Sequence, residues 1–178
     1  HASLTGHLVL STLHTNDALG AVFRLLDMKI ERFLLASTLK TVVAQRLARR
    51  LCDKCKQEVS LPQAEIESMS GELKSVPLNI LKAELPEMQN AGDLSAYKFY
   101  RPVGCSHCEN TGFTGRVAIS EVIDINDTLK EMINKGDKNF DINAVKASQD
   151  FISIRQDGIV KVVKGVTTME EILRVIES

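Results

Sequence analysis

The sequence is poor in aromatic residues, which make up 4% of its 178 residues and include no tryptophan. Because apolar residues still make up 44% of the chain, the hydrophobic core must be built from leucine, isoleucine, valine and alanine. This composition favours helices packed on a sheet over a β-sandwich. The length is enough for one domain, or for one domain with a smaller module.

The sequence also lacks an excess of positive charge, since its formal net charge is −1. A protein whose main task is to grip nucleic acid is usually more basic, because that affinity depends on neutralising phosphates. No apolar run approaches the roughly 18 to 20 residues that span a bilayer, and no signal peptide is visible. The chain starts at His1 inside a well-patterned segment, so we expect it to be part of a longer protein.

By composition the chain divides into three regions, without an internal repeat or a low-complexity tract. Residues 1–51 are dense in apolar side chains, residues 52–112 hold all four cysteines, and residues 113–178 return to strand-like and helical patterns. Within the second region, residues 56–104 are polar. We expect this stretch to be rich in loops and to have a weak core of its own.

Local patterns in the first region predict a strand followed by helices. Gly6–Leu13 is short, apolar and bounded by glycine and polar residues, which indicates a buried strand. A helix is expected over about 17–27, and Thr15 or Asn16 can cap its first turn. A second helix is expected from Glu31 through Leu39.

The later patterns are less uniform. Val42–Leu51 is compatible with either a helix or a strand, whereas Arg116–Ile125 alternates and predicts a strand. Two or three helices are expected after it. The last of them should begin at Thr168, because a glutamate three residues later completes a capping-box pattern.

Two Cys-x-x-Cys pairs, Cys52 with Cys55 and Cys105 with Cys108, are the strongest chemical signal in the chain. The two-residue spacer lets both thiolates of a pair face one ion, and two pairs complete a tetrahedral site of four sulfurs, which suits Zn²⁺. Such a closed site has no open position for substrate. We therefore expect a structural zinc ion that ties together the ends of residues 56–104.

Other interpretations of the four cysteines fit less well. A secreted scaffold held by two disulfides would be smaller and richer in cysteine, and a thioredoxin-like motif needs one pair rather than two. His107 can replace one cysteine as a ligand, but a bystander inside the knuckle is the simpler interpretation. Four nearby basic residues would offset part of the charge of the thiolates: Arg49, Arg50, Lys54 and Lys56.

Two histidines flank the first predicted strand. His7 and His14 would point to opposite faces of it, because side chains alternate along a strand, so they are not expected to share a metal. His14 falls at the carboxyl end of the strand, where α/β sheets form their ligand crevices. From spacing alone, the simpler interpretation is that both histidines are structural.

The segment Thr5–Ala18 resembles the histidine box of the ATPases that assemble type II secretion systems and type IV pili. Three later segments resemble the same family in the same order: Ala44–Cys52, which enters its metal-binding module, Gly104–Arg116, which leaves it, and Val117–Val122, which rejoins the motor domain. The four cysteines are typical of the secretion and pilus-extension members, whereas the retraction motors lack them.

The resemblance implies an α/β fold: the C-terminal part of a RecA-like P-loop NTPase domain, interrupted by the zinc insertion and followed by a helical bundle. It also implies a homo-hexameric ATPase that binds ATP and Mg²⁺ and drives an inner-membrane platform protein from the cytoplasm. No G-x-x-x-x-G-K-[S/T] loop occurs in this sequence, so the phosphate-binding half of the active site would lie upstream. The isolated chain is then expected to be inactive.

The same resemblance assigns roles to individual residues. His14 would lie near the γ-phosphate, His7 would link the strand to its neighbours, and Thr12 would polarise the site. Arg46 would contact a phosphate or a subunit interface, although a solvated arginine at a strand edge is the simpler interpretation.

Two other functions are compatible with the sequence. One is a non-enzymatic, zinc-stabilised protein-interaction module. The other is a zinc-ribbon nucleic-acid binder, against which the near-neutral charge and the absence of an aromatic platform weigh, so no nucleic-acid partner is expected.

Overall fold

The computed structural model describes residues 2–88, 90–136 and 140–177. The chain forms two compact units, one built from His1–Ala44 and Glu121–Phe151 and the other from Gln45–Ser120 and Ile152–Ser178. This division cuts across the three regions expected from composition, because the two longest strands each contribute residues to both units.

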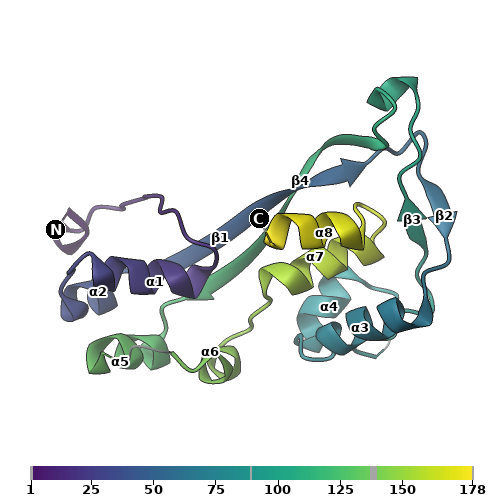
Figure 1. Cartoon of the computed structure of the whole chain (residues 1–178). Coiled ribbons are helices and arrows are strands. Elements are labelled where there is room, and N and C mark those ends of the chain that lie inside the picture. The colour runs from purple at the N-terminus through teal and green to yellow at the C-terminus, as the bar shows by residue number, and fades with distance from the viewer. Residues whose placement is uncertain (1, 89, 137–139, 178) are drawn as a thin grey trace. The chain divides into compact units, whose positions relative to one another are not determined.

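In the first unit, the described helical segments are η1 (Ala2–Thr5), α1 (Ala18–Asp27), α2 (Arg32–Thr38), α5 (Asp127–Lys135) and α6 (Ile142–Ser148) (Figure 1). Helix α5 packs against both α2 and α6. The buried side chains of Leu35, Leu129 and Ile133 lie on α2 and α5, so the contact between these two helices is part of the core of the unit.

In the second unit, the described elements besides the two long strands are β2 (Gln57–Val59), α3 (Gln63–Leu73), α4 (Leu78–Glu84), β3 (Phe99–Arg101), η2 (Ser106–Cys108), α7 (Ile154–Val163) and α8 (Met169–Ile176). Strands β2 and β3 pair antiparallel, with Val59 opposite Phe99. Helix α7 packs against α3 and α8, and Figure 1 shows the three helices together.

The two long strands, β1 (Thr41–Leu51) and β4 (Phe113–Asp124), pair with each other. The segment whose pattern was ambiguous is therefore a strand, and the strand expected over 116–125 is confirmed with an earlier start. On β4, Ile119 and Ile123 are fully buried, as the period of two along a strand requires.

The buried strand expected at Gly6–Leu13 is wrong. After η1 the chain is irregular up to α1, and Leu8 and Leu10 expose 89% and 87% of their surface. A strand needs a neighbour to satisfy its backbone N–H and C=O groups, and none of the described strands pairs with this segment. An apolar pattern alone therefore does not create the strand.

Helix predictions were closer to the structure. Helices α1 and α2 lie where expected, but α1 is capped by Asp17, whose Oδ1 accepts a hydrogen bond from the Gly20 amide at 2.6 Å, and not by Thr15 or Asn16. After β4 the described chain forms four helices, α5 to α8, rather than two or three.

The stretch 56–104 has long irregular parts, as its polar composition indicated, but it also has well-buried residues that were not expected. It contains α3 and α4, and Met69, Leu73, Leu81 and Leu85 are at most 1% exposed. Met69 and Leu73 are an i, i+4 pair on one face of α3, whereas Leu81 lies on α4 and Leu85 just after its end. Because α3 packs against α7, the insertion shares the core of the second unit.

The start of α8 follows the capping-box pattern only in part. Thr168 Oγ1 accepts a hydrogen bond from the Glu171 amide at 3.3 Å, as expected. The Glu171 carboxylate, however, accepts from the Arg49 amide at 2.8 Å and from the guanidinium groups of Arg49 and Arg174 at 2.8 and 2.6 Å. Its side chain is 1% exposed, and it joins α8 to β1 inside the second unit.

The arginines around Glu171 determine its ionisation. Burial acts to raise the pKa of this carboxyl, but the hydrogen bonds from Arg174 and Arg49 outweigh burial and lower the pKa to about 2, from an ordinary value of 4.5. The carboxylate therefore stabilises the fold above about pH 4.5, and this contribution is lost as the pH falls toward 2.

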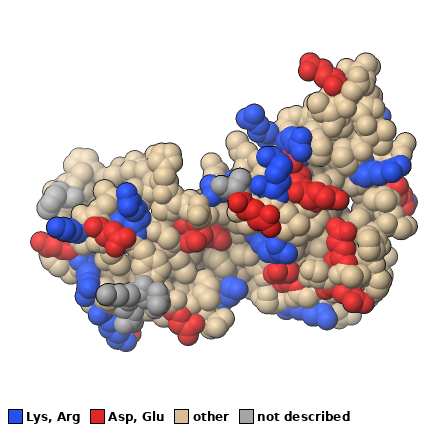
Figure 2. Space-filling model, in the orientation of Figure 1, with Lys and Arg blue, Asp and Glu red and all other residues tan. Residues whose placement is uncertain are grey.

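The surface carries both signs of charge, interspersed on the face that Figure 2 shows. No helix in the described parts of the chain combines the length and apolarity that crossing a bilayer requires.

Replacing Glu171 with glutamine should lower the free energy of unfolding at pH 7 by about 2 to 3 kcal/mol, because the charge-assisted bonds to two arginines are lost. The variant should also lose less stability than the wild type between pH 4.5 and pH 2. Urea unfolding at pH 7 and pH 3 measures both effects. As a control, the exposed Glu177→Gln should change the stability by less than about 0.5 kcal/mol. Equal pH dependence in the two variants would contradict the assignment.

Candidate metal centre and histidine segment

The four cysteines meet in the second unit. Cys52 follows β1, Cys55 lies in the turn after it, and Cys105 and Cys108 lie at the start and end of η2. All four are free thiols, and their Sγ atoms lie within 4.8 Å of one another. The distances are 3.9 Å between Cys52 and Cys105, 3.8 Å between Cys55 and Cys108, and 3.7 Å between Cys105 and Cys108.

These distances fit a single tetrahedral metal site. A zinc–sulfur bond of about 2.3 Å places neighbouring sulfurs about 3.8 Å apart, whereas bonded sulfurs in a disulfide lie about 2.05 Å apart. His107 is exposed and lies outside this group, so among the described residues the four sulfurs supply the donor set that can hold a metal ion.

Backbone amides converge on the sulfurs. The Gly104 amide donates to Cys55 Sγ at 3.3 Å, and the amides of Cys105 and Gly112 donate to Cys108 Sγ at 3.2 Å each. In addition, the Cys52 amide donates to the Gly112 carbonyl at 2.9 Å, which ties the first knuckle to the second. Partial positive charge from these N–H groups favours the thiolate form, which is the form that binds metal.

Glycine is required at position 112 for steric reasons. Its φ is +76°, and a Cβ atom there would lie 2.5 Å from the Cβ of Pro102, too close for any side chain. The glycine that follows the second cysteine pair therefore has a packing cause, because it lets the chain pass against Pro102 while the Gly112 amide reaches Cys108.

The thiols differ in acidity. Burial acts to raise the pKa of Cys108, but hydrogen bonds from the amides of Cys105 and Gly112 lower it to about 6. Burial dominates at Cys55 and raises its pKa to about 11. The Sγ atoms of these two residues lie 3.8 Å apart, so the two thiols titrate as an interacting pair.

The basic residues near the cysteines are largely occupied elsewhere. Arg50 and Lys56 pair with Asp53 at 3.0 and 3.2 Å, and Arg49 pairs with Glu171 at 2.8 Å. The groups that contact sulfur directly are backbone amides, and whether the nearby cations offset part of the thiolate charge stays a prediction.

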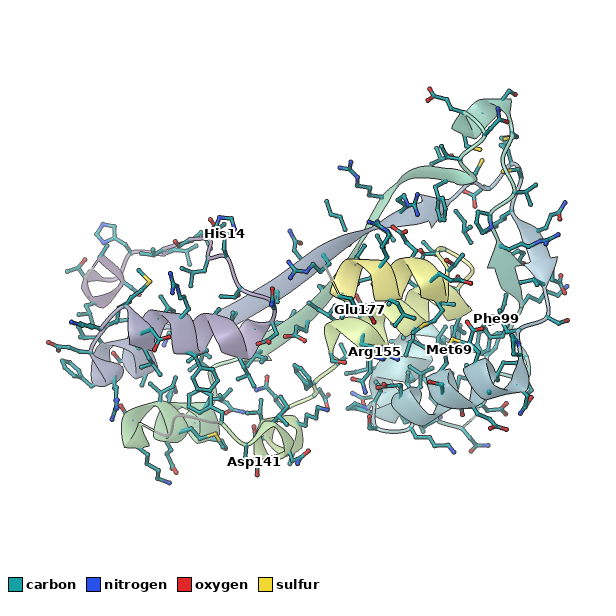
Figure 3. The ribbon with its side chains drawn as sticks, in the orientation of Figure 1. His14, Met69, Phe99, Asp141, Arg155 and Glu177 are labelled. Carbon is teal, nitrogen blue, oxygen red and sulfur yellow. The ribbon has the colours of Figure 1, made fainter. Side chains whose placement is uncertain are left out.

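The histidine segment lies in the first unit. His7, Thr12 and His14 are all exposed, and Figure 3 shows His14 on the irregular segment with its side chain directed away from α1. His7 Nδ1 lies 3.0 Å from Thr5 Oγ1, so it has a local partner. Arg46 is half-buried on β1 and belongs to the second unit with the cysteines.

Two features were not found from the sequence. Glu121 on β4 is 7% exposed and accepts a hydrogen bond from the Ala18 amide at 2.7 Å, at the start of α1. An acidic residue in an alternating apolar strand was the available signal. The second unit also contains a hollow of about 480 Å³, whose lining includes Arg49, Phe113 and Glu171 but none of the cysteines or the predicted catalytic residues.

Comparison with known proteins gives a consistent result. Over residues 1–174 the chain matches the protein family described as Type II/IV secretion system protein. It is 42% identical over 174 residues to type II secretion system protein E of Aeromonas hydrophila, an alignment that covers 98% of this chain and 30% of that protein. It is 40% identical over 172 residues to type IV pilus assembly ATPase PilB of Myxococcus xanthus, covering 97% and 27%. The chain thus spans less than a third of the length of these curated relatives.

Removing one sulfur should empty the metal site and loosen the adjoining chain. We expect about one zinc ion per chain in protein purified without chelator, and well under half of that in Cys105→Ser. Proteolysis within residues 56–104 should be faster in this variant. His107→Ala is the matched control and should keep both its zinc and its digestion pattern. Zinc loss in His107→Ala, or no zinc in the wild type, would refute the four-sulfur site.

Proposed function

Because this chain belongs to the Type II/IV secretion system protein family, we propose that it is the C-terminal portion of a hexameric ATPase that powers type II secretion or type IV pilus assembly. The observation that carries the proposal is the family match over residues 1–174, which includes the histidine box and both cysteine pairs. Relatives from both kinds of machine have similar identities, so the proposal covers both.

In this proposal the full-length protein binds ATP and Mg²⁺ through a phosphate-binding loop outside the present sequence. The histidine segment then supplies the opposite side of the active site. Phosphoryl transfer depends mainly on positioning and on stabilising the charge that develops, which an imidazole can do. The exposed side chain of His14 is open to a nucleotide held by other parts of the protein, while Thr12 polarises the site and His7 links neighbouring elements.

Arg46 takes the role of a phosphate or subunit contact. It lies on β1, ahead of the first cysteine pair, and is half-buried. The role rests on the family resemblance, and a structural role on the strand is the alternative.

The four cysteines hold a structural zinc ion in this proposal. A metal bound there supplies a cross-link between the end of β1 and the chain that returns through η2. The site has four protein donors and therefore no position for substrate or for an attacking water. Its contribution is to the fold of the second unit rather than to the chemistry of ATP.

The partners that we propose are other copies of the same protein, arranged in a hexamer, and the inner-membrane platform protein of the secretion or pilus machine. The protein would act in the cytoplasm, peripheral to the inner membrane through these partners. The net charge of −1 and the mixed charges on the face that Figure 2 shows support protein partners over nucleic acid, whose binding needs a basic face.

A non-enzymatic, zinc-stabilised interaction module is the second candidate. The observation in its favour is that the cysteine cluster and the C-terminal helices α7 and α8 form one compact unit, while no phosphate-binding loop occurs in the sequence. Nucleotide binding by the full-length protein separates the two candidates.

The full-length protein should hydrolyse ATP, and the chain 1–178 alone should show no turnover above background. In the full-length protein His14→Ala should lower kcat by about 10²-fold, with a smaller effect on ATP affinity, because the imidazole acts on charge that develops during transfer. Steady-state phosphate release and nucleotide titration measure the two quantities.

The matched control is His107→Ala, which removes another exposed histidine and should leave kcat unchanged. ATP turnover that co-purifies with the chain 1–178 would show that the active site is not divided as proposed. A full-length protein that binds no nucleotide would favour the interaction module.

A further inference from the structure

A buried carboxylate lies at the start of α1, a few residues after His14. Glu121 comes from β4, is 7% exposed, and its Oε1 accepts a hydrogen bond from the Ala18 amide at 2.7 Å. Burying a carboxylate is costly unless hydrogen bonds and opposite charge compensate. The first turn of a helix supplies both, through unpaired amides and the positive end of the helix dipole.

The residues between His14 and α1 are held from several sides. Asp17 Oδ1 accepts from the Gly20 amide at 2.6 Å, and Thr15 Oγ1 donates to the Asp17 carbonyl at 3.1 Å. With the bond from Ala18 to Glu121, three short hydrogen bonds fix the backbone that follows His14. Two of them end within the local segment, and the third anchors it to a strand more than one hundred residues away in sequence.

The carboxylates of Glu121 and Asp17 also limit what the start of α1 can bind. A free helix N-terminus attracts phosphate, because its amides point outward and carry positive charge. In α1 the amides of Ala18 and Gly20 are taken by Glu121 and Asp17, and both acceptors are negative. These two amides are therefore not available to a phosphate group.

From these contacts we propose that Glu121 is a positioning residue for His14. This inference rests on the proposed function, in which His14 acts on the phosphate. Glu121 fixes the backbone from which the imidazole projects, and a displacement of about 1 Å at a catalytic group can cost about 10²-fold in rate. Glu121 is itself buried, so it acts through the segment and does not touch the nucleotide.

A purely structural role for Glu121 would produce a loss of stability without a specific loss of rate. The chain contains a matched case that separates the two roles. Asp157 on α7 has a side chain that is 15% exposed, and its Oδ2 accepts a hydrogen bond from the Ser120 amide at 2.7 Å. This bond has the same length as that of Glu121 and also joins a carboxylate to a backbone amide, but both of its residues belong to the second unit, and Asp157 in addition pairs with Lys161.

The experiment compares Glu121→Ala, Glu121→Gln and Asp157→Ala in the full-length protein, below their melting temperatures. Glu121→Ala should lower kcat by about 10-fold or more and change the KM for ATP by less than about 2-fold. Glu121→Gln keeps an oxygen that can accept from Ala18 and should recover most of the rate. Asp157→Ala should lose stability but keep its kcat. Amide exchange at Ala18 should speed up in Glu121→Ala alone.

Each result has a distinct meaning. If Glu121→Ala keeps the wild-type kcat while His14→Ala is slow, the positioning role is wrong and the proposed function stands. If His14→Ala is itself as fast as the wild type, the role of His14 fails and the positioning role fails with it. An equal loss of kcat in Asp157→Ala would show a general effect of stability and also overturn the inference.

Should Glu121→Ala fail to fold, Glu121→Asp replaces it. The shorter side chain keeps the charge but withdraws the acceptor from Ala18 by about one carbon–carbon bond, roughly 1.5 Å. A normal kcat in that variant, together with fast amide exchange at Ala18, would overturn the positioning role.

Discussion

Hydrogen bonds from backbone amides to carboxylates join the long strands to the helices, and much of the structure depends on these bonds. A two-stranded sheet leaves the outer edge of each strand unpaired, so its amides need partners from elsewhere. Glu171 on α8 accepts a hydrogen bond from the amide of Arg49 on β1, and Asp157 on α7 accepts one from the amide of Ser120 on β4. In the first unit the strand supplies the carboxylate and the helix the amide, because Glu121 on β4 accepts a hydrogen bond from the Ala18 amide at the start of α1. In a chain with few aromatic residues, such bonds give each unit a specific arrangement that apolar packing alone would leave loosely defined.

The parts of the fold that sequence patterns predicted well are those governed by local chemistry. The spacing within each cysteine pair is sufficient to form a knuckle, and the periodicity of α1 and β4 is sufficient to indicate a helix and a strand. The strand predicted at Gly6–Leu13 was wrong because a strand depends on a neighbouring strand for its backbone hydrogen bonds. The core within the insertion was missed because its buried residues, such as Met69 and Leu81, are few among many polar ones. The insertion also packs through α3 against α7, a helix far along the chain. Glu121 was missed because its partner is the amide of Ala18, which has no signature in sequence.

The two functional regions differ in how much of their geometry this chain contains. The cysteine cluster is complete, since all four donors and the amides that orient them belong to the second unit. The histidine segment has ordered anchors at its end but an open side chain at His14. A structural metal site can be built by one stretch of chain, whereas an ATPase site of this family would need groups from elsewhere. The difference in completeness agrees with the separate roles proposed for the two regions.

The exposed segment before α1 has a consequence for the behaviour of the chain in solution. Residues 8–13 contain four large apolar side chains and no charge, proline or glycine, and Leu8 and Leu10 are almost fully open. Short segments of this composition pair readily with copies of themselves when nothing covers them. The apolar, uncharged composition that suits the segment to join a sheet also promotes its self-association when it is uncovered. A surface that covers this stretch would remove that tendency to self-association.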